Sequence, residues 1–277
     1  MIKYPYKLFL VAIFSFVSSI THAEVSDASI DKLLELSGLT MQVEQFPGLI
    51  KAGMEEAKAY GAPIPDAEFS SMVYSIDEWI SPSEIISGIR ASVKNTINEQ
   101  EARKLLAWYE SDLGKEITRA EKSASTPEAY QQMVQSAQSL MADSERVEFA
   151  NRLDELLGAT DMTMDLQKST GLAVYSAIFS ALQPGTSVDM AQFEDEVDAE
   201  NARARPDIKK LITVSFLYSY KDIAMDDLKK YESFLSDSAT MKFNKTIMSS
   251  MNRELGSSVS KWAEKLAEIF IRNNQPV

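Results

Sequence analysis

The amino-acid sequence predicts an all-α protein made of two tandem copies of a multi-helix unit, packed as one or two helical bundles. Three observations predict this fold class. Glycine and proline fall at the edges of periodic apolar runs, alternation of β-branched residues is nearly absent, and two blocks of residues recur in the same order. We therefore expect a leader at residues 1–23, a first helical unit at 24–143 and a second, diverged unit at 144–277.

Residues 1–23 have the pattern of a cleavable secretory signal peptide. Lys3 and Lys7 precede an apolar run, Leu8–Val17, and small residues stand three and one positions before a cut after Ala23. The run is about half of the ~20 apolar residues that a transmembrane helix needs. We expect cleavage, export to the periplasm and no membrane span in the mature chain. The alternative is an uncleaved N-terminal anchor.

The mature chain is predicted to be strongly acidic. Loss of Lys3 and Lys7 leaves 26 of the 28 basic residues against 41 acidic ones, a formal charge of −15. Nucleic-acid binding depends on clustered lysine and arginine, which neutralise phosphates and release counterions. The longest basic runs are pairs such as Lys209-Lys210. We therefore expect no nucleic-acid partner.

The residue inventory excludes several chemistries. The chain has no cysteine, and its one histidine, His22, lies in the predicted signal peptide. A mature chain without either cannot form a disulfide, a thiolate nucleophile, the usual structural zinc sites or an imidazole general base. The acidic stretch from Asp189 to Glu200 lacks the spacing of a calcium loop, so we interpret it as a solvated helix face. The sequence thus predicts no metal site, no cofactor and no catalytic residue.

Helix boundaries are chemically explicit along the mature chain. Capping residues precede a first-turn proline or a glutamate three positions on at Ser81-Pro82, Asn98–Glu101 and Thr126-Pro127. Helix stops are indicated at Gly38, Gly61, Gly158 and Pro184-Gly185. Between these points, apolar residues recur three or four apart, which predicts roughly ten to twelve amphipathic helices of ordinary globular length.

The duplication rests on two matching blocks. At an offset of 123 residues, Leu33-Leu34, Leu39–Met41 and Gly48-Leu49 match Leu156-Leu157, Met162–Met164 and Gly171-Leu172. At an offset of 122, Leu106, Tyr109–Ser111 and Leu113 match Leu228, Tyr231–Ser233 and Leu235. Two blocks in the same order, with nearly equal offsets, indicate an internal repeat.

One segment of the first copy carries a family resemblance. Leu105–Lys115 reads Leu-Leu-Ala-Trp-Tyr-Glu-Ser-Asp-Leu-Gly-Lys and resembles the most characteristic part of the domain of unknown function 2059, found in exported proteins of Gram-negative bacteria. The similarity spans most of the first copy. The second copy departs from it, with Ser236-Asp237 at the Gly-Lys pair and Lys230 at the tryptophan. The resemblance implies a helical fold and export, and it implies no particular activity.

The repeated Tyr-Glu-Ser motif and the family-like segment around its first copy supply the candidate binding residues, which are Trp108, Tyr109, Glu110, Gly114, Lys115, Tyr231 and Glu232. Tyr109 and Glu110 could form an acid/base pair beside Lys115 if burial or charge moved their pKa values toward neutrality. Alternatively, the tyrosine rings fill the core while the glutamates are solvated. Adjacent helical residues point about 100° apart, which favours the packing interpretation.

These observations favour a non-enzymatic binding or interaction protein. Two helical units would present a groove to a protein, a peptide or an apolar, lipid-like ligand. Five methionines could line such an adaptable surface or simply fill the core: Met162, Met164, Met241, Met248 and Met251. The alternative function is an envelope hydrolase or lyase running on Tyr109, Glu110 and Lys115.

Overall fold

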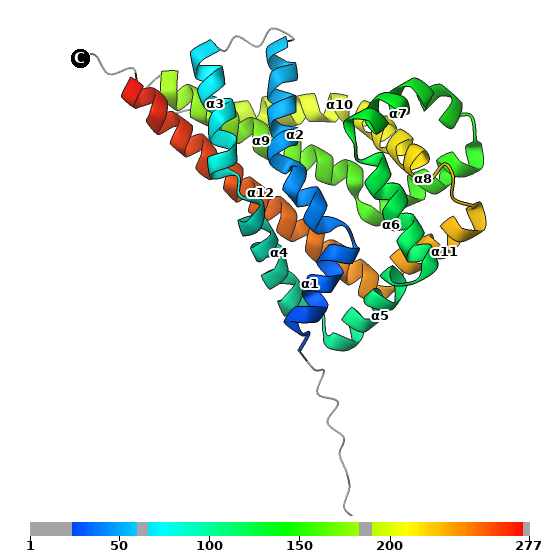
Figure 1. Cartoon of the computed structure of the whole chain (residues 1–277). Coiled ribbons are helices and arrows are strands. Elements are labelled where there is room, and N and C mark those ends of the chain that lie inside the picture. Colours follow the sequence, from blue (N-terminus) through cyan, green and yellow to red (C-terminus); the bar gives the residue numbers. More distant parts are fainter. Residues whose placement is uncertain (1–23, 60–65, 183–189, 274–277) are drawn as a thin grey trace, which may run out of the picture.

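A computed structural model describes residues 24–59, 66–182 and 190–273, and these ranges are helical almost throughout. The predicted signal peptide and the predicted stops at Gly61 and Pro184-Gly185 lie outside the described residues. The described ranges contain twelve helices: α1 Asp27–Leu36, α2 Leu39–Ala59, α3 Asp66–Trp79, α4 Pro82–Thr96, α5 Glu99–Tyr109, α6 Asp112–Ala124, α7 Pro127–Leu140, α8 Ser144–Leu157, α9 Ala159–Leu182, α10 Met190–Ser219, α11 Met225–Leu235 and α12 Ser238–Asn273 (Figure 1). The all-α prediction is confirmed.

The predicted helix starts are confirmed at Ser81, Asn98 and Thr126, whose side chains each accept a bond from a backbone N–H in the first turn. Asn98 forms a full capping box. Its Oδ1 accepts from the Glu101 N–H at 2.9 Å, and the Glu101 carboxylate accepts from the Asn98 N–H at 2.8 Å. Gly38 and Gly158 have positive φ angles of 76° and 63°, the left-handed conformation that ends α1 and α8.

The long C-terminal helix α12 forms the spine of the main core. It runs diagonally along one side of the molecule and packs against α3, α4, α5 and α9 (Figure 1). Its apolar stripe, from Phe243 to Leu266, is buried with residues of α1 to α5. Residues of both predicted units therefore meet in one core, which we call the main core.

The repeated motif does not occupy equivalent places in the two halves. Tyr109 is the last residue of α5 and Ser111 caps α6, whereas Tyr231 and Ser233 lie inside α11. The helices themselves correspond at a different offset, since α5 and α11 both have 11 residues and begin 126 positions apart, at Glu99 and Met225. The motif thus falls about one turn earlier in α11. The duplication of the whole unit stays a prediction.

A second, smaller core lies beside the main core, between α6, α8, α11 and the end of α10. Arg146 of α8 fixes the chain that follows α10. Its guanidinium donates to the carbonyl oxygens of Tyr220 and Ile223 at 2.9 and 2.8 Å. Phe234 of α11 packs against both cores. The chain between α10 and α11 is therefore held against α8, beside the candidate site.

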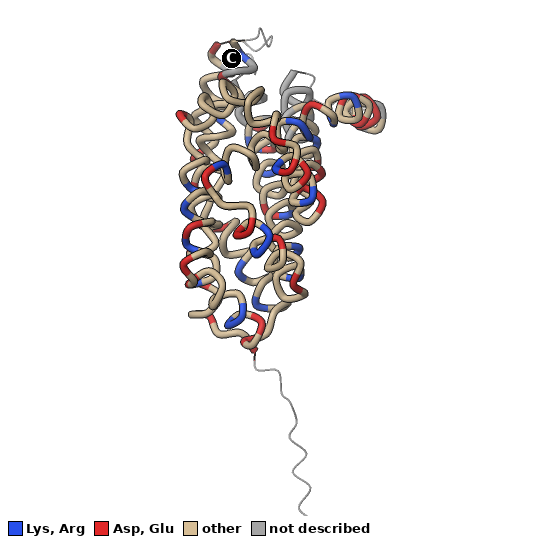
Figure 2. Tube along the Cα trace, turned by 90° about the vertical axis from the view of Figure 1, so that its right-hand side faces the viewer, with Lys and Arg blue, Asp and Glu red and all other residues tan. Residues whose placement is uncertain are grey.

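The surface is mixed in charge. Acidic and basic residues are interspersed over the helices (Figure 2). Most ion pairs join exposed side chains, and such pairs contribute little to stability. Within the part of the chain that the structure describes, none of the helices has both the length and the apolar character needed to cross a membrane.

Candidate functional site

A cavity of about 350 Å³ lies where the two cores meet. The turn between α1 and α2 contributes to its wall, as do α5, α6, α9, α10, α11 and α12. Apolar side chains such as Leu39, Ile247 and Phe243 line part of the wall, and tyrosine and serine hydroxyls line the rest. Its lining residues come from both predicted units.

Glu121 of α6 is the polar centre of this cavity. Its Oε1 accepts hydrogen bonds from the hydroxyl of Tyr220 at 2.6 Å and from that of Tyr231 at 2.9 Å. Tyr109 lines the same cavity from α5. We call Tyr109, Glu121, Tyr220 and Tyr231 the tyrosine–glutamate cluster. It joins the consecutive helices α5 and α6 to the end of α10 and to α11, which lie about a hundred residues further along the chain.

Burial dominates the electrostatics of the cluster. Burial raises the pKa of the Glu121 carboxyl above its usual range, against the lowering effect of the hydrogen bonds from Tyr220 and Tyr231. The Tyr109 pKa is also raised, first by burial and then by the Glu121 charge, and the pKa values of Tyr220 and Tyr231 are raised by the same two causes. The three phenols therefore stay protonated near neutral pH and can act as donors.

Replacing Glu121 with glutamine is expected to stabilise the protein at pH 8 and to have little effect at pH 4. Glutamine keeps an acceptor oxygen for the two tyrosines. Because the folded-state pKa of Glu121 is raised, its stabilising contribution is present below the unfolded value of 4.5 and is lost as the pH rises through the folded pKa. Urea unfolding of both proteins at the two pH values measures this difference. An equal change at pH 4 and pH 8 would contradict the raised pKa.

Trp108 contacts the cluster through Tyr231 but does not line the cavity. Its ring stacks on Phe234, with centroids 4.4 Å apart, and on Tyr231, with centroids 6.1 Å apart. Tyr109 meets the same Phe234 ring edge to face at 5.7 Å. These contacts join α5 to α11 and hold the Tyr231 ring in place. Trp108 is thus a packing residue that positions Tyr231.

Gly114 has a steric role in the first turn of α6. A Cβ atom at this position would lie 2.1 Å from the carbonyl oxygen of Trp108. The same carbonyl accepts from the hydroxyl of Ser111 at 2.6 Å, and the Ser111 Oγ accepts from the Gly114 N–H at 3.0 Å. The glycine lets α6 begin directly against the end of α5. This contact explains the glycine of the Gly-Lys pair without a ligand.

The charged candidates do not line the cavity. Glu110 is exposed and forms an ion pair with Lys32. Glu232 accepts two bonds from Arg152, at 2.6 and 3.2 Å. Lys115 is exposed on α6. The structure therefore brings Tyr109 and Tyr231 together and leaves Glu110, Lys115 and Glu232 outside the site, so the acid/base set of Tyr109, Glu110 and Lys115 is not assembled.

Sequence reasoning missed Glu121 and Tyr220. The available signal was the register of α6, where Gly114, Ile117 and Thr118 are buried and Glu121 follows on the same face at helical spacing. Of the five methionines, Met162 and Met248 line the cavity, and Met251 is buried in the main core. Met241 is exposed, and the half-buried Met164 accepts a hydrogen bond from Arg205 outside the cavity lining. Among the described residues there is no group of three or more side chains that could hold a metal ion.

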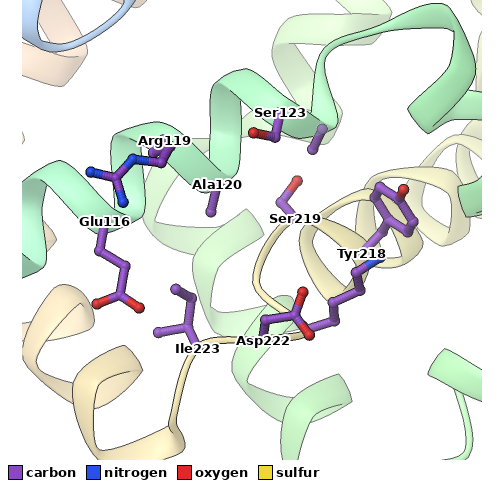
Figure 3. A pocket seen from close by; sticks show the side chains of 10 residues that line it. Glu116, Arg119, Ala120, Ser123, Tyr218, Ser219, Asp222 and Ile223 are labelled. Atoms are coloured by element: carbon purple, nitrogen blue, oxygen red, sulfur yellow. The ribbon is translucent and has the colours of Figure 1, made fainter.

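A second hollow, of about 330 Å³, lies between α6 and the end of α10 (Figure 3). Charged side chains of both signs line it, with Glu116 and Arg119 on α6 and Lys221 and Asp222 after α10. The Lys221 ammonium lies 4.0 Å from the centroid of the Tyr218 ring. The charged side chains that line this groove between α6 and the end of α10 are exposed and carry charges of both signs. In the cavity, by contrast, Glu121 is the one charged residue among the described lining residues.

Comparison with known proteins gives one match. Residues 89–144 match the family model of an uncharacterized protein conserved in bacteria (DUF2059). This confirms the resemblance that Leu105–Lys115 carries in the sequence. The matched segment includes Tyr109 and Glu121, and it ends before Tyr220 and Tyr231. No curated protein and no solved structure matches the chain.

Proposed function

We propose that the protein is a non-enzymatic periplasmic binding protein that holds a small, partly apolar molecule in the cavity beside Glu121. The observation that carries this proposal is the tyrosine–glutamate cluster inside a preformed cavity. Ligand sites typically have volumes of ~300–1,000 Å³ and combine apolar walls with a few convergent polar groups. The cavity, of about 350 Å³, has this composition and this size. Its small volume favours a small molecule over a protein or peptide.

The division of roles within the cavity follows from its lining. Apolar side chains, including Met162 and Ile247, would bury the body of the ligand and supply most of the binding free energy. The cluster would fix the polar end, because its tyrosine rings are held by stacking and by hydrogen bonds to Glu121. A rigid polar end reduces the entropy lost on binding.

Filling the cavity is expected to weaken the binding of an apolar probe. We choose Ser215→Phe, because Ser215 lines the cavity from α10, and N-phenyl-1-naphthylamine, whose fluorescence rises in apolar surroundings. The expected result is saturable fluorescence enhancement with the unaltered protein and at least ~10-fold weaker binding with Ser215→Phe, equivalent to about 1.4 kcal/mol.

Ser123→Phe is the matched control, because Ser123 lines the groove on the other side of α6 (Figure 3). It should leave the probe affinity unchanged. Equal affinity of Ser215→Phe and the unaltered protein would overturn the assignment of the cavity. Circular dichroism of both variants checks that each is folded.

The signal-like sequence at residues 1–23 supports the periplasmic part of the proposal. If cleavage follows Ala23, the mature chain begins at Glu24, which pairs with Asn98, and the next residue, Val25, is buried. Osmotic shock should release the protein, and its mass should correspond to a chain that begins at Glu24. A protein retained in spheroplasts with Met1 intact would contradict this location.

A further inference from the structure

We infer that the ligand of the cavity is an organic cation, with an ammonium group at Glu121 and an apolar body against the remaining wall. This inference rests on the proposed function and names the class of ligand. It comes from three properties of the cavity: its charge, the free oxygen of Glu121 and its aromatic lining.

The charge of the cavity is unbalanced. Glu121 is the one charged side chain among the described residues that line it. No lysine or arginine in the described ranges lies within ion-pair distance of its carboxylate. A partly buried carboxylate such as that of Glu121 is costly to ionise unless a counter-charge accompanies it. A cationic ligand would provide that charge, and an anionic ligand would add repulsion.

The hydrogen bonding of Glu121 is also one-sided. Tyr220 and Tyr231 both donate to Oε1. Oε2 has no hydrogen-bond partner within the described part of the chain. This oxygen is not fully enclosed by protein atoms. This oxygen can therefore accept a bond from a ligand. An ammonium N–H would form a charge-assisted bond there, which is stronger than a bond from a neutral hydroxyl.

Aromatic rings line the cavity around this carboxylate. Tyr109, Tyr220 and Tyr231 belong to the cluster, and Phe216 and Phe243 contribute further rings. Cations are attracted to aromatic faces within about 6 Å of the ring centroid. Carboxylate and aromatic lining together favour an amine over an alcohol of the same shape.

Isothermal titration calorimetry at pH 8 with three matched probes tests the ligand class. Pentylammonium, 1-pentanol and pentanoate share an apolar chain and differ in charge. We expect pentylammonium to bind at least ~10-fold more tightly than 1-pentanol, and pentanoate not to bind. Glu121→Gln should reduce pentylammonium affinity to about that of 1-pentanol. The probe comparison on the unaltered protein stands even if this variant does not fold.

The pH dependence of probe affinity provides an independent test of the role of Glu121. Glu121 must be ionised to pair with the ammonium, and the titratable groups that face it are Tyr109 from α5, Tyr220 after α10 and Tyr231 from α11. These phenols stay neutral between pH 5 and pH 8, so the change in charge comes from Glu121. Protonation of Glu121 should weaken pentylammonium binding as the pH decreases from 8 to 5, whereas 1-pentanol affinity should not change.

The outcomes separate the two proposals. If 1-pentanol binds as tightly as pentylammonium and Ser215→Phe weakens both, the cavity binds ligands and the inferred charge preference is wrong. Tighter binding of pentanoate would also overturn the preference. If none of the probes, including N-phenyl-1-naphthylamine, binds in a manner sensitive to Ser215→Phe, then both the ligand class and the proposed function are wrong.

Discussion

Replacing Trp262 by alanine is expected to lower the free energy of unfolding by about 4 kcal/mol, the upper range for removal of a buried aromatic side chain. Trp262 of α12 is fully buried in the main core. Its indole N–H donates to the Oγ of Ser75, a buried residue of α3, at 2.8 Å. The substitution would therefore create a cavity and leave the Ser75 hydroxyl without this donor.

Urea unfolding measures the loss, and Lys261→Ala is the matched control, because the neighbouring Lys261 is exposed on the same helix. We expect the control to change stability by less than about 0.5 kcal/mol. The result bears on how the two predicted units are joined. If Trp262→Ala costs no more than the control, α12 does not hold the two units in one core.

Replacing Gly114 by alanine is expected to cost about 3 kcal/mol, because the new methyl group would meet backbone atoms that cannot rotate away. The carbonyl oxygen of Trp108 lies 2.1 Å from the position of the added Cβ, and the Cα of Tyr109 lies 3.1 Å from it. Relief would require α5 and α6 to separate. Since Tyr109 and Glu121 lie on these helices, probe binding in the cavity should weaken as well.

Gly256→Ala provides the comparison for this substitution. Gly256 is inside α12, and an added Cβ there would meet nothing within 4 Å. Alanine should stabilise the helix at this position by ~0.5–1 kcal/mol. The two variants should thus change the unfolding midpoint in opposite directions. A stabilising effect of Gly114→Ala would show that the close contact with Trp108 does not exist.

The sequence predicted the helices well because their boundaries are local. A cap such as Asn98 or a stop such as Gly158 acts within one helical turn, so both could be identified without tertiary structure. The buried stripe of α12 was likewise visible in its helical spacing. The sequence left open whether the two units pack as one bundle or two, because that depends on contacts such as the one between Trp262 and Ser75.

The site was predicted only in part. Tyr109 and Tyr231 were singled out by a repeated motif, yet the motif falls at different positions in α5 and α11, and the tyrosines meet through tertiary packing. Glu121 was overlooked because a glutamate in an acidic chain is ordinarily solvated. Its role depends on the hydroxyls of Tyr220 and Tyr231, which lie about a hundred residues further along the chain.

The proposed binding cavity can be tested most directly by NMR of methyl-labelled methionines during titration with N-phenyl-1-naphthylamine. Met162 and Met248 line the cavity, whereas Met72 is buried in the main core and Met241 is exposed. We predict saturable shifts of the Met162 and Met248 methyl resonances, with those of Met72 and Met241 unmoved. Saturable binding that moves Met241 and leaves Met162 and Met248 unchanged would place the ligand elsewhere and contradict the proposed site.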